Sequence, residues 1–243
     1  MKKLLLLLAI LPFMISCNGQ DKIDWATVNL PIPLDSISKN YKLFQPYSNI
    51  NSNIKYYKSL DQKFLYVWNT NLDGGLELKY DDGYTAINEN FADIFVSEPD
   101  NKLLAIRLYT EDPKSTDKLI NLVNEKLGKT DYHYFFNDNE KATVRQKIWK
   151  NKNKYYTLEV NDPDYYIGKV TKTARLTIFN DENNPFVKYW FYDGGNFSGF
   201  YGQYLDEKNK PEHNGKNYTY RSFVEQMDRE NKNFGTTSDF FVK

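Results

Sequence analysis

Residues 103–128 read LLAIRLYTEDPKSTDKLINLVNEKLG, and along this stretch the pattern changes from that of a strand to that of a helix. Every second residue from Leu104 to Leu108 is apolar, which predicts a β-strand. After Asp112-Pro113 the apolar residues follow the spacing of one helix face, and Gly128 stands where a helix commonly ends. This stripe consists of Leu119, Leu122, Val123 and Leu127. We therefore expect a strand followed directly by a helix.

Further strands are predicted after this helix, with no second helix between them. They cover residues 131–136, 144–150, 155–160 and 174–180. Consecutive strands joined by short turns pair antiparallel, and a neighbouring helix then covers a face of the sheet. The sequence thus predicts an α+β fold, a mostly antiparallel sheet with one or two helices packed on one face.

The flanking regions carry weaker local signals. Alternation at 64–68 and again at 76–80 predicts a hairpin around the turn-rich residues 69–75. Short helices are expected at 36–43 and 218–231. The spacing of Asn and Asp from Asn69 to Gly74 copies the opening of a calcium loop, but its final Glu ligand is replaced by Tyr80. We expect a hairpin turn here and no metal site.

The N-terminus has the features of a secretory signal. Lys2 and Lys3 precede an apolar run over residues 4–15, which is shorter than the roughly 20 residues that span a bilayer. Cys17, the only cysteine of the chain, follows this run. A cut after Ser16 would leave bulky Met14 three residues before the cleavage point, so an ordinary signal cleavage site fits poorly.

Met14-Ile15-Ser16-Cys17 resembles the lipobox of bacterial lipoproteins, although Met14 stands where that family usually has Leu. The resemblance covers residues 1–20 and implies that Cys17 becomes the acylated first residue of the mature chain. It also implies a cell-envelope protein held by its lipid, in the outer membrane of a Gram-negative bacterium, because Asn18 is not the aspartate associated with inner-membrane retention. We expect a periplasmic or surface-exposed body, with a free or core cysteine as the alternative.

The domain organisation follows from this signal. Residues 1–16 are the signal peptide, residues 17–35 are expected to be the acylated cysteine and a proline-containing tether, and residues 36–243 form a single α+β domain. The chain holds 32 basic and 32 acidic residues. Nucleic acid is not the expected partner, because binding phosphates requires a concentrated basic surface.

No catalytic residue, metal site or cofactor is predicted. His133 and His213 are far apart in the sequence and lack a zinc-ligand spacing. The stretch Gly195–Gly199 is one residue out of register with a nucleophile elbow, and we expect a glycine-rich surface loop instead.

The feature that points to function is a group of aromatic residues interleaved with glycines after residue 188. Glycines weaken strands, so rings on glycine-rich loops favour a recognition surface for a sugar or a protein. The alternative is that alternate rings simply face the core of an edge strand. An AT-rich coding sequence also explains the 20 tyrosines of the chain. The candidate binding residues are Trp190, Tyr192, Phe197 and Tyr201.

These observations favour a non-enzymatic binding or interaction module with an unknown protein or glycan partner. Two alternatives stay open. One is an inhibitor or immunity-type lipoprotein, which a protruding or charged face would favour. The other is a secreted glycan or lipid hydrolase, which a pocket with paired carboxylates would favour.

Overall fold

The computed structural model describes most of the chain after residue 21. The described residues are 22–39, 42–44, 53–130, 132–138, 141–166, 169–181, 183–193, 198–214 and 216–230. Cys17 and Phe197 lie outside these ranges, so the predictions made for them are not addressed by the structure.

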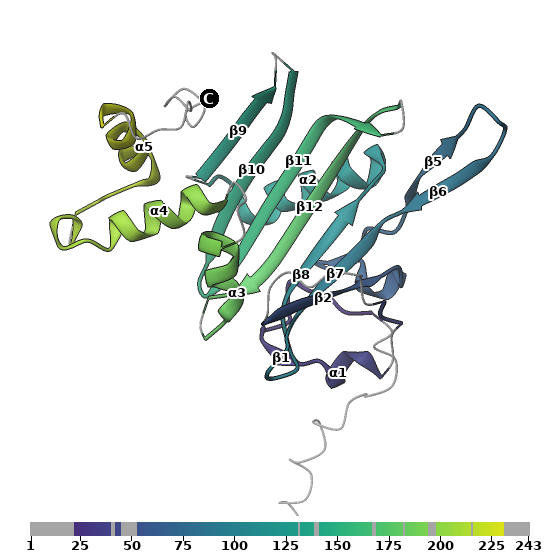
Figure 1. Ribbon diagram of the computed structural model, residues 1–243, viewed down its shortest axis with the longest axis horizontal. Helices are drawn as coiled ribbons and strands as arrows, with labels where there is room; N and C mark the ends of the chain where they lie inside the picture. The colour runs from purple at the N-terminus through teal and green to yellow at the C-terminus, as the bar shows by residue number, and fades with distance from the viewer. Residues whose placement is uncertain are drawn as a thin grey trace, which may run out of the picture.

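Among the described residues, eight strands form one sheet in which every neighbouring pair is antiparallel (Figure 1). The order is β2-β7-β8-β12-β11-β10-β9, and β1 pairs with β8 off this path. The strands are β1 (Ile32–Pro33), β2 (Ile54–Ser59), β7 (Phe91–Ser97), β8 (Lys102–Thr110), β9 (Tyr132–Asp138), β10 (Lys141–Asn151), β11 (Lys154–Tyr166) and β12 (Lys169–Asn180). The predicted α+β fold is confirmed.

Helix α2 (Pro113–Leu127) follows β8 as the sequence predicts. The side chain of Asp112 accepts the backbone N–H of Ser115 at 2.9 Å, which satisfies one of the free donors at the helix start. Gly128 ends the helix with φ +67°, a conformation that favours glycine. Leu119 and Val123 are fully buried against the sheet.

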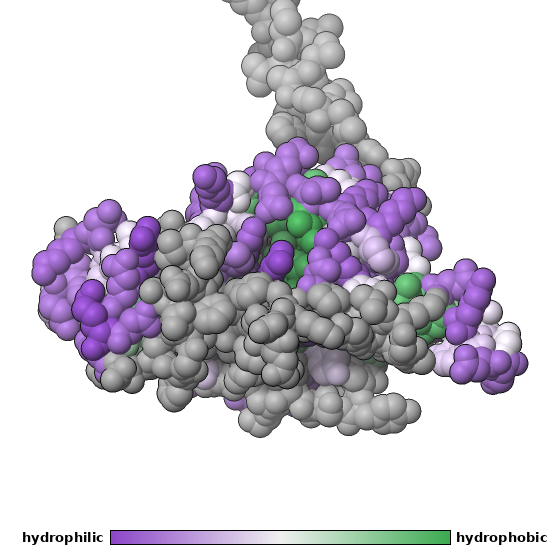
Figure 2. All heavy atoms as spheres, turned by 90° about the horizontal axis from the view of Figure 1, so that it is seen from above, coloured by the Kyte–Doolittle hydropathy of each residue, from purple (hydrophilic) through white to green (hydrophobic). Residues whose placement is uncertain are grey.

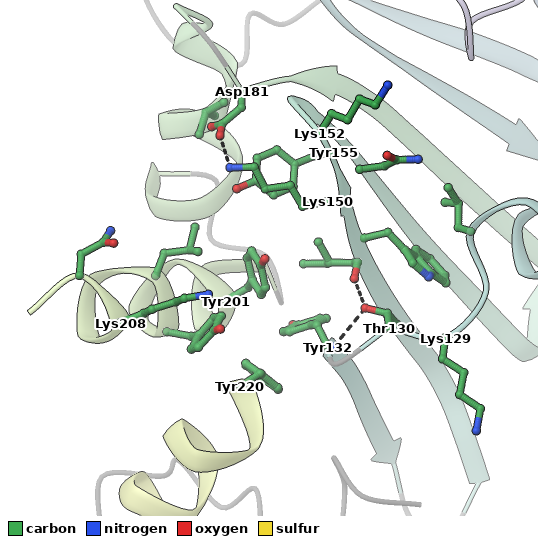
Figure 3. A pocket seen from close by; sticks show the side chains of 18 of the residues that line it. Lys129, Thr130, Tyr132, Lys150, Lys152, Tyr155, Asp181, Tyr201, Lys208 and Tyr220 are labelled. Atoms are coloured by element: carbon green, nitrogen blue, oxygen red, sulfur yellow. Dashed lines mark hydrogen bonds and ion pairs between the residues drawn. The ribbon is translucent and has the colours of Figure 1, made fainter. Parts of the chain in front are cut away.

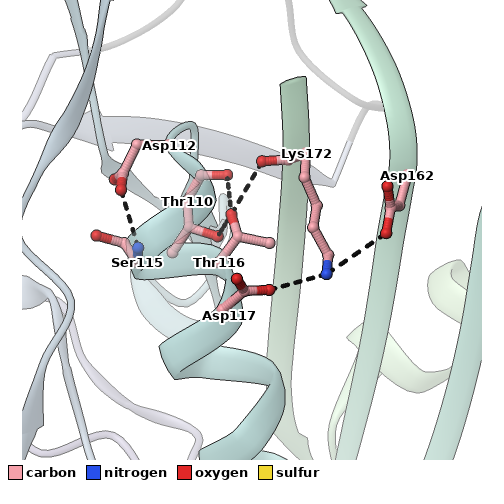
Figure 4. Close-up of polar contacts among 7 residues, drawn as sticks. All are labelled: Thr110, Asp112, Ser115, Thr116, Asp117, Asp162 and Lys172. Carbon is pink, nitrogen blue, oxygen red and sulfur yellow. Dashed lines mark hydrogen bonds and ion pairs between the residues drawn. The ribbon is translucent and has the colours of Figure 1, made fainter. Parts of the chain in front are cut away.

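Polar contacts fix the start of α2 to the sheet (Figure 4). The hydroxyls of Thr110 and Thr116 are 2.9 Å apart, and the Thr116 hydroxyl also donates to the backbone oxygen of Lys172 at 3.2 Å. The Lys172 ammonium lies 2.8 Å from a carboxylate oxygen of Asp117 and 3.4 Å from one of Asp162. These contacts join α2 to β8, β11 and β12.

The N-terminal segment is part of the folded body, and the prediction of a tether reaching residue 35 is wrong from residue 22 onward. Trp25 is fully buried, and its indole N–H donates to the backbone oxygen of Phe64 at 2.7 Å. The backbone N–H of Leu30 donates to Asn180 Oδ1 at 2.9 Å, on the last residue of β12. The burial of Trp25 and the hydrogen bond of Leu30 therefore fix a segment whose prolines had suggested a tether. This segment leads into α1 (Asp35–Ser38), the short form of the helix predicted at 36–43.

Two small hairpins lie between β2 and β7 in the sequence, and their strands pair differently from the prediction. The strands predicted at 64–68 and 76–80 do not pair with each other. Instead, Trp68 and Asn69 have φ of +47° and +59° and turn β3 back onto β4. The elements are η1 (Gln62–Phe64), β3 (Tyr66–Val67), β4 (Thr70–Asn71), β5 (Gly75–Lys79) and β6 (Thr85–Glu89). The β5–β6 hairpin projects from the body as a separate lobe (Figures 1 and 2).

A second helical layer covers the sheet face opposite α2. Adjacent strand residues point to opposite faces, so Tyr156 and Ile178 belong to the core under α2, while Tyr155 and Phe179 belong to a second core. The elements on this second side are α3 (Pro185–Lys188), the π-helical turn η2 (Tyr189–Asp193), α4 (Ser198–Lys208), η3 (Pro211–His213) and α5 (Tyr220–Arg229). The last of them matches the helix predicted at 218–231. None of the helices in the described ranges is long and apolar enough to cross a bilayer.

Candidate binding site

A cleft of about 750 Å³ opens between α4 and the sheet strands β9, β10 and β11 (Figure 3). Its described lining is dominated by two residue types. Six tyrosines contribute, namely Tyr132, Tyr155, Tyr192, Tyr201, Tyr204 and Tyr220. Five lysines contribute, namely Lys126, Lys129, Lys150, Lys152 and Lys208. Among the described lining residues, Asp181 is the only acid.

The tyrosine rings form a connected wall from the sheet to α4. The rings of Tyr132 on β9 and Tyr201 on α4 meet edge to face, with centroids 5.1 Å apart. Tyr201 in turn lies 5.6 Å from Tyr204 and 6.4 Å from Tyr155. Such offset and edge-on pairs stabilise one another beyond the area that they bury. Tyr132, Tyr155, Tyr204 and Tyr220 are at most 7% exposed and belong to the second core, so the wall is a packed base, from which Tyr201 and Tyr192 present more of their rings to the cleft.

Tyr155 and Tyr192 supply no charge to the cleft at neutral pH. Burial raises the pKa of Tyr155, and the nearby Asp181 carboxylate raises it further. Burial also raises the pKa of Tyr192 to about 12, helped by the hydrogen bond from its hydroxyl to Asp206 at 3.0 Å. Both phenols stay protonated and act as neutral donors and acceptors.

The positive charge of the cleft comes from lysines at its rim. Lys150 pairs with Asp181, which neutralises the acid of the lining. Lys208 lies with its ammonium 5.5 Å from the centre of the Tyr204 ring. Lys129 and Lys152 are exposed and extend outward at opposite sides of the opening (Figure 3). A ligand entering the cleft therefore meets an excess of positive charge.

A glycine lets α4 pack closely against η2, and both elements contribute residues to the cleft lining. A Cβ at Gly202 would lie 2.5 Å from the backbone oxygen of Phe191 in η2, which is too close for any other residue. The glycines of this region were predicted to mark a surface loop, but Gly199 and Gly202 lie inside a helix. In this helix Gly202 serves close packing rather than loop formation. Ser198 and Gly199 begin α4, so the surface loop expected at Gly195–Gly199 is wrong for these two residues, and residues 195–197 lie outside the described ranges.

The residues predicted from the aromatic and glycine pattern divide between core and cleft. Tyr192 and Tyr201 both line the cleft, and Tyr192 is 47% exposed. Trp190 is 6% exposed and stacks on Phe186 at 5.5 Å, so its ring belongs to the second core. Phe197 lies outside the described residues.

Sequence patterns did not predict the part of the site that the sheet provides. Tyr132 and Tyr155 are far from α4 in the sequence, and only the order of β9, β10 and β11 brings them beside it. The lysines had a local signal, because Lys150, Lys152 and Lys154 alternate with asparagines across the β10–β11 turn. That pattern does not tell which face of the sheet the turn serves.

The remaining candidates from the sequence do not form sites within the part of the chain that the structure describes. His213 stacks on Tyr218 at 3.8 Å between ring centres, and His133 lies on β9. The described side chains contain no group of three or more potential metal ligands of the His, Cys, Asp or Glu type. In the stretch that resembles a calcium loop, Asn71 Oδ1 accepts the backbone N–H of Asp73 at 3.0 Å, as in a turn.

No protein-family model, no curated protein and no solved structure matches this chain. The geometry of the cleft is therefore what points to a function.

Proposed function

We propose that the chain is an envelope lipoprotein, acylated at Cys17, whose body is a non-enzymatic binding module for an acidic oligosaccharide. The observation that carries this proposal is the cleft, which six tyrosines and five lysines line; Lys150 is paired with Asp181 and Lys126 with Glu125.

The exposed tyrosine faces of the cleft, those of Tyr192 and Tyr201, suit a sugar ligand. A phenol ring offers an apolar face to the C–H groups of a sugar ring, while its hydroxyl bonds to the sugar hydroxyls. Tyr192, whose ring is 47% exposed, presents such a surface at the opening. The volume of about 750 Å³ falls in the range of small-molecule sites and suits a ligand of a few sugar rings.

The lysine rim favours an acidic sugar over a neutral one. Lys129, Lys152 and Lys208 stand at the opening without an acid of the lining paired to them, since Lys150 holds Asp181. Carboxylated or sulfated sugars would be drawn in by this charge, and added salt would weaken the attraction.

Binding without hydrolysis is supported by the acid content of the lining. Glycoside hydrolysis generally requires two carboxyl groups facing each other across the scissile bond. The described lining has one, Asp181, and it is paired with Lys150.

The test is calorimetric titration of the full chain with trigalacturonate, an acidic trimer, and with maltotriose, a neutral one. We expect saturable binding of trigalacturonate that weakens with added salt, and weaker or no binding of maltotriose. Lys152→Gln and Lys208→Gln should each lower the affinity for the acidic trimer about two- to fivefold, the range of exposed charge pairs. Lys114→Gln, an exposed lysine in the first turn of α2 and outside the cleft, is the matched control. Equal binding of the two trimers would contradict the proposed role of the lysines.

A second function, that of an inhibitor or immunity-type lipoprotein, is supported by the β5–β6 hairpin. It projects from the body and exposes 64% of Tyr84 and 66% of Ile87 (Figure 2). Exposed apolar side chains on a projecting element are typical of protein contacts. A photocrosslinker placed at residue 84 should capture one envelope protein, and Ile87→Ser should abolish that product. If the crosslinker labels many proteins and Ile87→Ser does not change this labelling, the result contradicts this second function.

A further inference from the structure

A second hollow, of about 200 Å³, lies on the same sheet face as the cleft. The η2 turn contributes to both, with Tyr192 in the cleft and Trp190 in the hollow. The floor of the hollow is polar. Arg107, Thr177 and Thr157 lie side by side across β8, β12 and β11. Arg175, Glu159 and Gln146 form the next row, across β12, β11 and β10.

Two buried groups of this hollow have no hydrogen-bond partner among the described residues. They are the hydroxyl of Thr157, a residue only 2% exposed, and the indole N–H of Trp190, a residue only 6% exposed. Leaving a buried polar group unpaired costs free energy, and such groups in native proteins generally have a partner. The indole N–H can only donate, so its missing partner must be an acceptor.

The Arg107 guanidinium is fixed in place beside these groups. Its Nη1–H donates to the Tyr109 hydroxyl at 2.9 Å, and its Nε–H donates to the Thr177 hydroxyl at 3.3 Å. It also lies 4.8 Å from the centre of the Trp190 ring and 5.0 Å from that of Phe95. These contacts leave part of a five-donor group for other acceptors, and a positioned guanidinium binds oxyanions with little further ordering.

The described lining of the hollow contains Arg107 and Arg175 against one acid, Glu159, which Arg175 holds at 2.8 Å. A second acid, Asp93 on β7, lies outside the lining but is the cross-strand neighbour of Arg107 and interacts with its charge, so the charges around the hollow are balanced. The features that favour an oxyanion are therefore the unpartnered donors and the fixed guanidinium, which meet in one small space.

We propose that this hollow binds a small oxyanion, a carboxylate, phosphate or sulfate group, between the indole N–H of Trp190, the hydroxyl of Thr157 and the Arg107 guanidinium. The space of about 200 Å³ exceeds the roughly 30 Å³ that one water occupies in the liquid, so it accommodates such a group. This site is independent of the sugar-binding cleft, and either can fail without the other.

The test uses the indole N–H resonance of Trp190, assigned by its disappearance in Trp190→Phe. The full chain is titrated with acetate, phosphate and sulfate in separate experiments, which distinguish the three sources of an oxyanion. We expect at least one of them to shift the Trp190 resonance saturably. Calorimetry should show that the affinity falls about tenfold in Thr157→Val and in Trp190→Phe, the range expected when a hydrogen bond to a charged group is lost.

Thr171→Val is the matched control, because Thr171 also has a buried hydroxyl without a described partner but lies outside the hollow. It should keep the parental anion affinity. Thr157→Val should also keep or gain thermal stability, since it removes an unpaired buried hydroxyl and preserves the shape of the side chain. Trp190→Phe leaves a cavity in the second core and should melt lower, so its affinity is measured at a temperature at which it is folded. Two results would overturn the proposal. One is the absence of a saturable shift with all three anions, which would mean that the hollow holds only water. The other is parental anion affinity in both variants.

Discussion

The α-carbon of Gly202 faces the backbone oxygen of Phe191 so closely that a Cβ would lie 2.5 Å from it. This contact joins α4 to the π-helical turn η2, and both elements contribute residues to the cleft lining. The packing of these two elements therefore depends on the absence of one side chain.

Gly202→Ala should destabilise the protein by about 1–3 kcal/mol, because the added methyl must push α4 away from rigid backbone. Gly199→Ala is the control, since a Cβ there would lie 3.7 Å from the same oxygen, an ordinary contact. That variant should unfold at the parental urea concentration or slightly above it. Equal losses in urea titration would show that the two positions are equally tight.

Val123→Asp should lower the free energy of unfolding by about 3–5 kcal/mol, because it places an unpaired charge in the core under α2. Asn121→Asp introduces the same residue on the exposed side of the helix and should change stability by less than about 0.5 kcal/mol. Thermal or urea unfolding measures both. Similar losses for the two variants would mean that the apolar face of α2 is wrongly assigned.

Stability should fall above about pH 10 because of buried tyrosines such as Tyr156. Burial, together with the nearby Asp24 carboxylate, raises the pKa of Tyr156 to about 12 in the folded state. Below about pH 10 the phenol is protonated in both states, so the stability is fully present. As the pH rises toward 12, the unfolded chain ionises first, and the free energy of unfolding falls by about 1.4 kcal/mol per pH unit for this group.

Urea unfolding at a series of alkaline pH values checks this slope. Tyr156→Phe keeps the ring that stacks on Trp68 at 5.3 Å. It should make the decrease of the free energy of unfolding with pH less steep, by the contribution of one titrating proton. Tyr84→Phe, on a ring that is 64% exposed, should leave the slope as in the parent. If the free energy of unfolding of Tyr156→Phe decreases with pH as steeply as that of the parent, other groups cause the loss of stability at alkaline pH.

Tyr192→Ala should weaken binding of the acidic trimer about tenfold or more while keeping the melting temperature, because its ring is exposed at the cleft opening. Trp190→Ala should instead lower the melting temperature, because it leaves a cavity in the second core. Calorimetry and thermal unfolding are measured on the same samples. If Tyr192→Ala melts at a lower temperature but binds the trimer as the parent does, Tyr192 contributes to packing and not to binding.

Cys17→Ala should abolish incorporation of a clickable palmitate analogue in a bacterial host, if the cysteine is acylated as proposed. Ser16→Ala is the control, since it keeps a small residue before the cysteine and should label as the parent does. Labelling of Cys17→Ala at the parental level would contradict the lipobox assignment.

Local patterns predicted the elements whose signals are complete within one segment. The α2 helix has its stripe, its Asp112 cap and its terminal Gly128 within a single run, and the structure places it from Pro113 to Leu127. The large strands were found for the same reason, although β10, β11 and β12 extend further than predicted. Local rules suffice where the competing signals agree.

The errors come from tertiary contacts that reverse a local signal. Glycine has a low helix propensity, so Gly202 argues locally against a helix. It nevertheless lies within α4, where a residue with a Cβ would clash with the backbone of Phe191. Residues 22–34 contain prolines that suggest a tether, yet Trp25 is drawn into the core by its area and its bond to Phe64. The cleft joins segments as distant as Tyr132 and Tyr220, so no local pattern reports it.

The burial of the N-terminal segment also sets how far the body can stand from a membrane. Lys22 donates to Asn69 at 2.8 Å, and Lys154 donates to the backbone oxygens of Ala26 and Val28 at 2.9 and 2.8 Å, so the segment is fixed to the body almost from its start. Four residues lie between Cys17 and Lys22, so five Cα–Cα steps join them. At about 3.6 Å per step these reach at most about 18 Å. If Cys17 is acylated as proposed, Lys22 therefore lies within about 18 Å of the lipid-bearing residue, and the body stays close to the membrane surface.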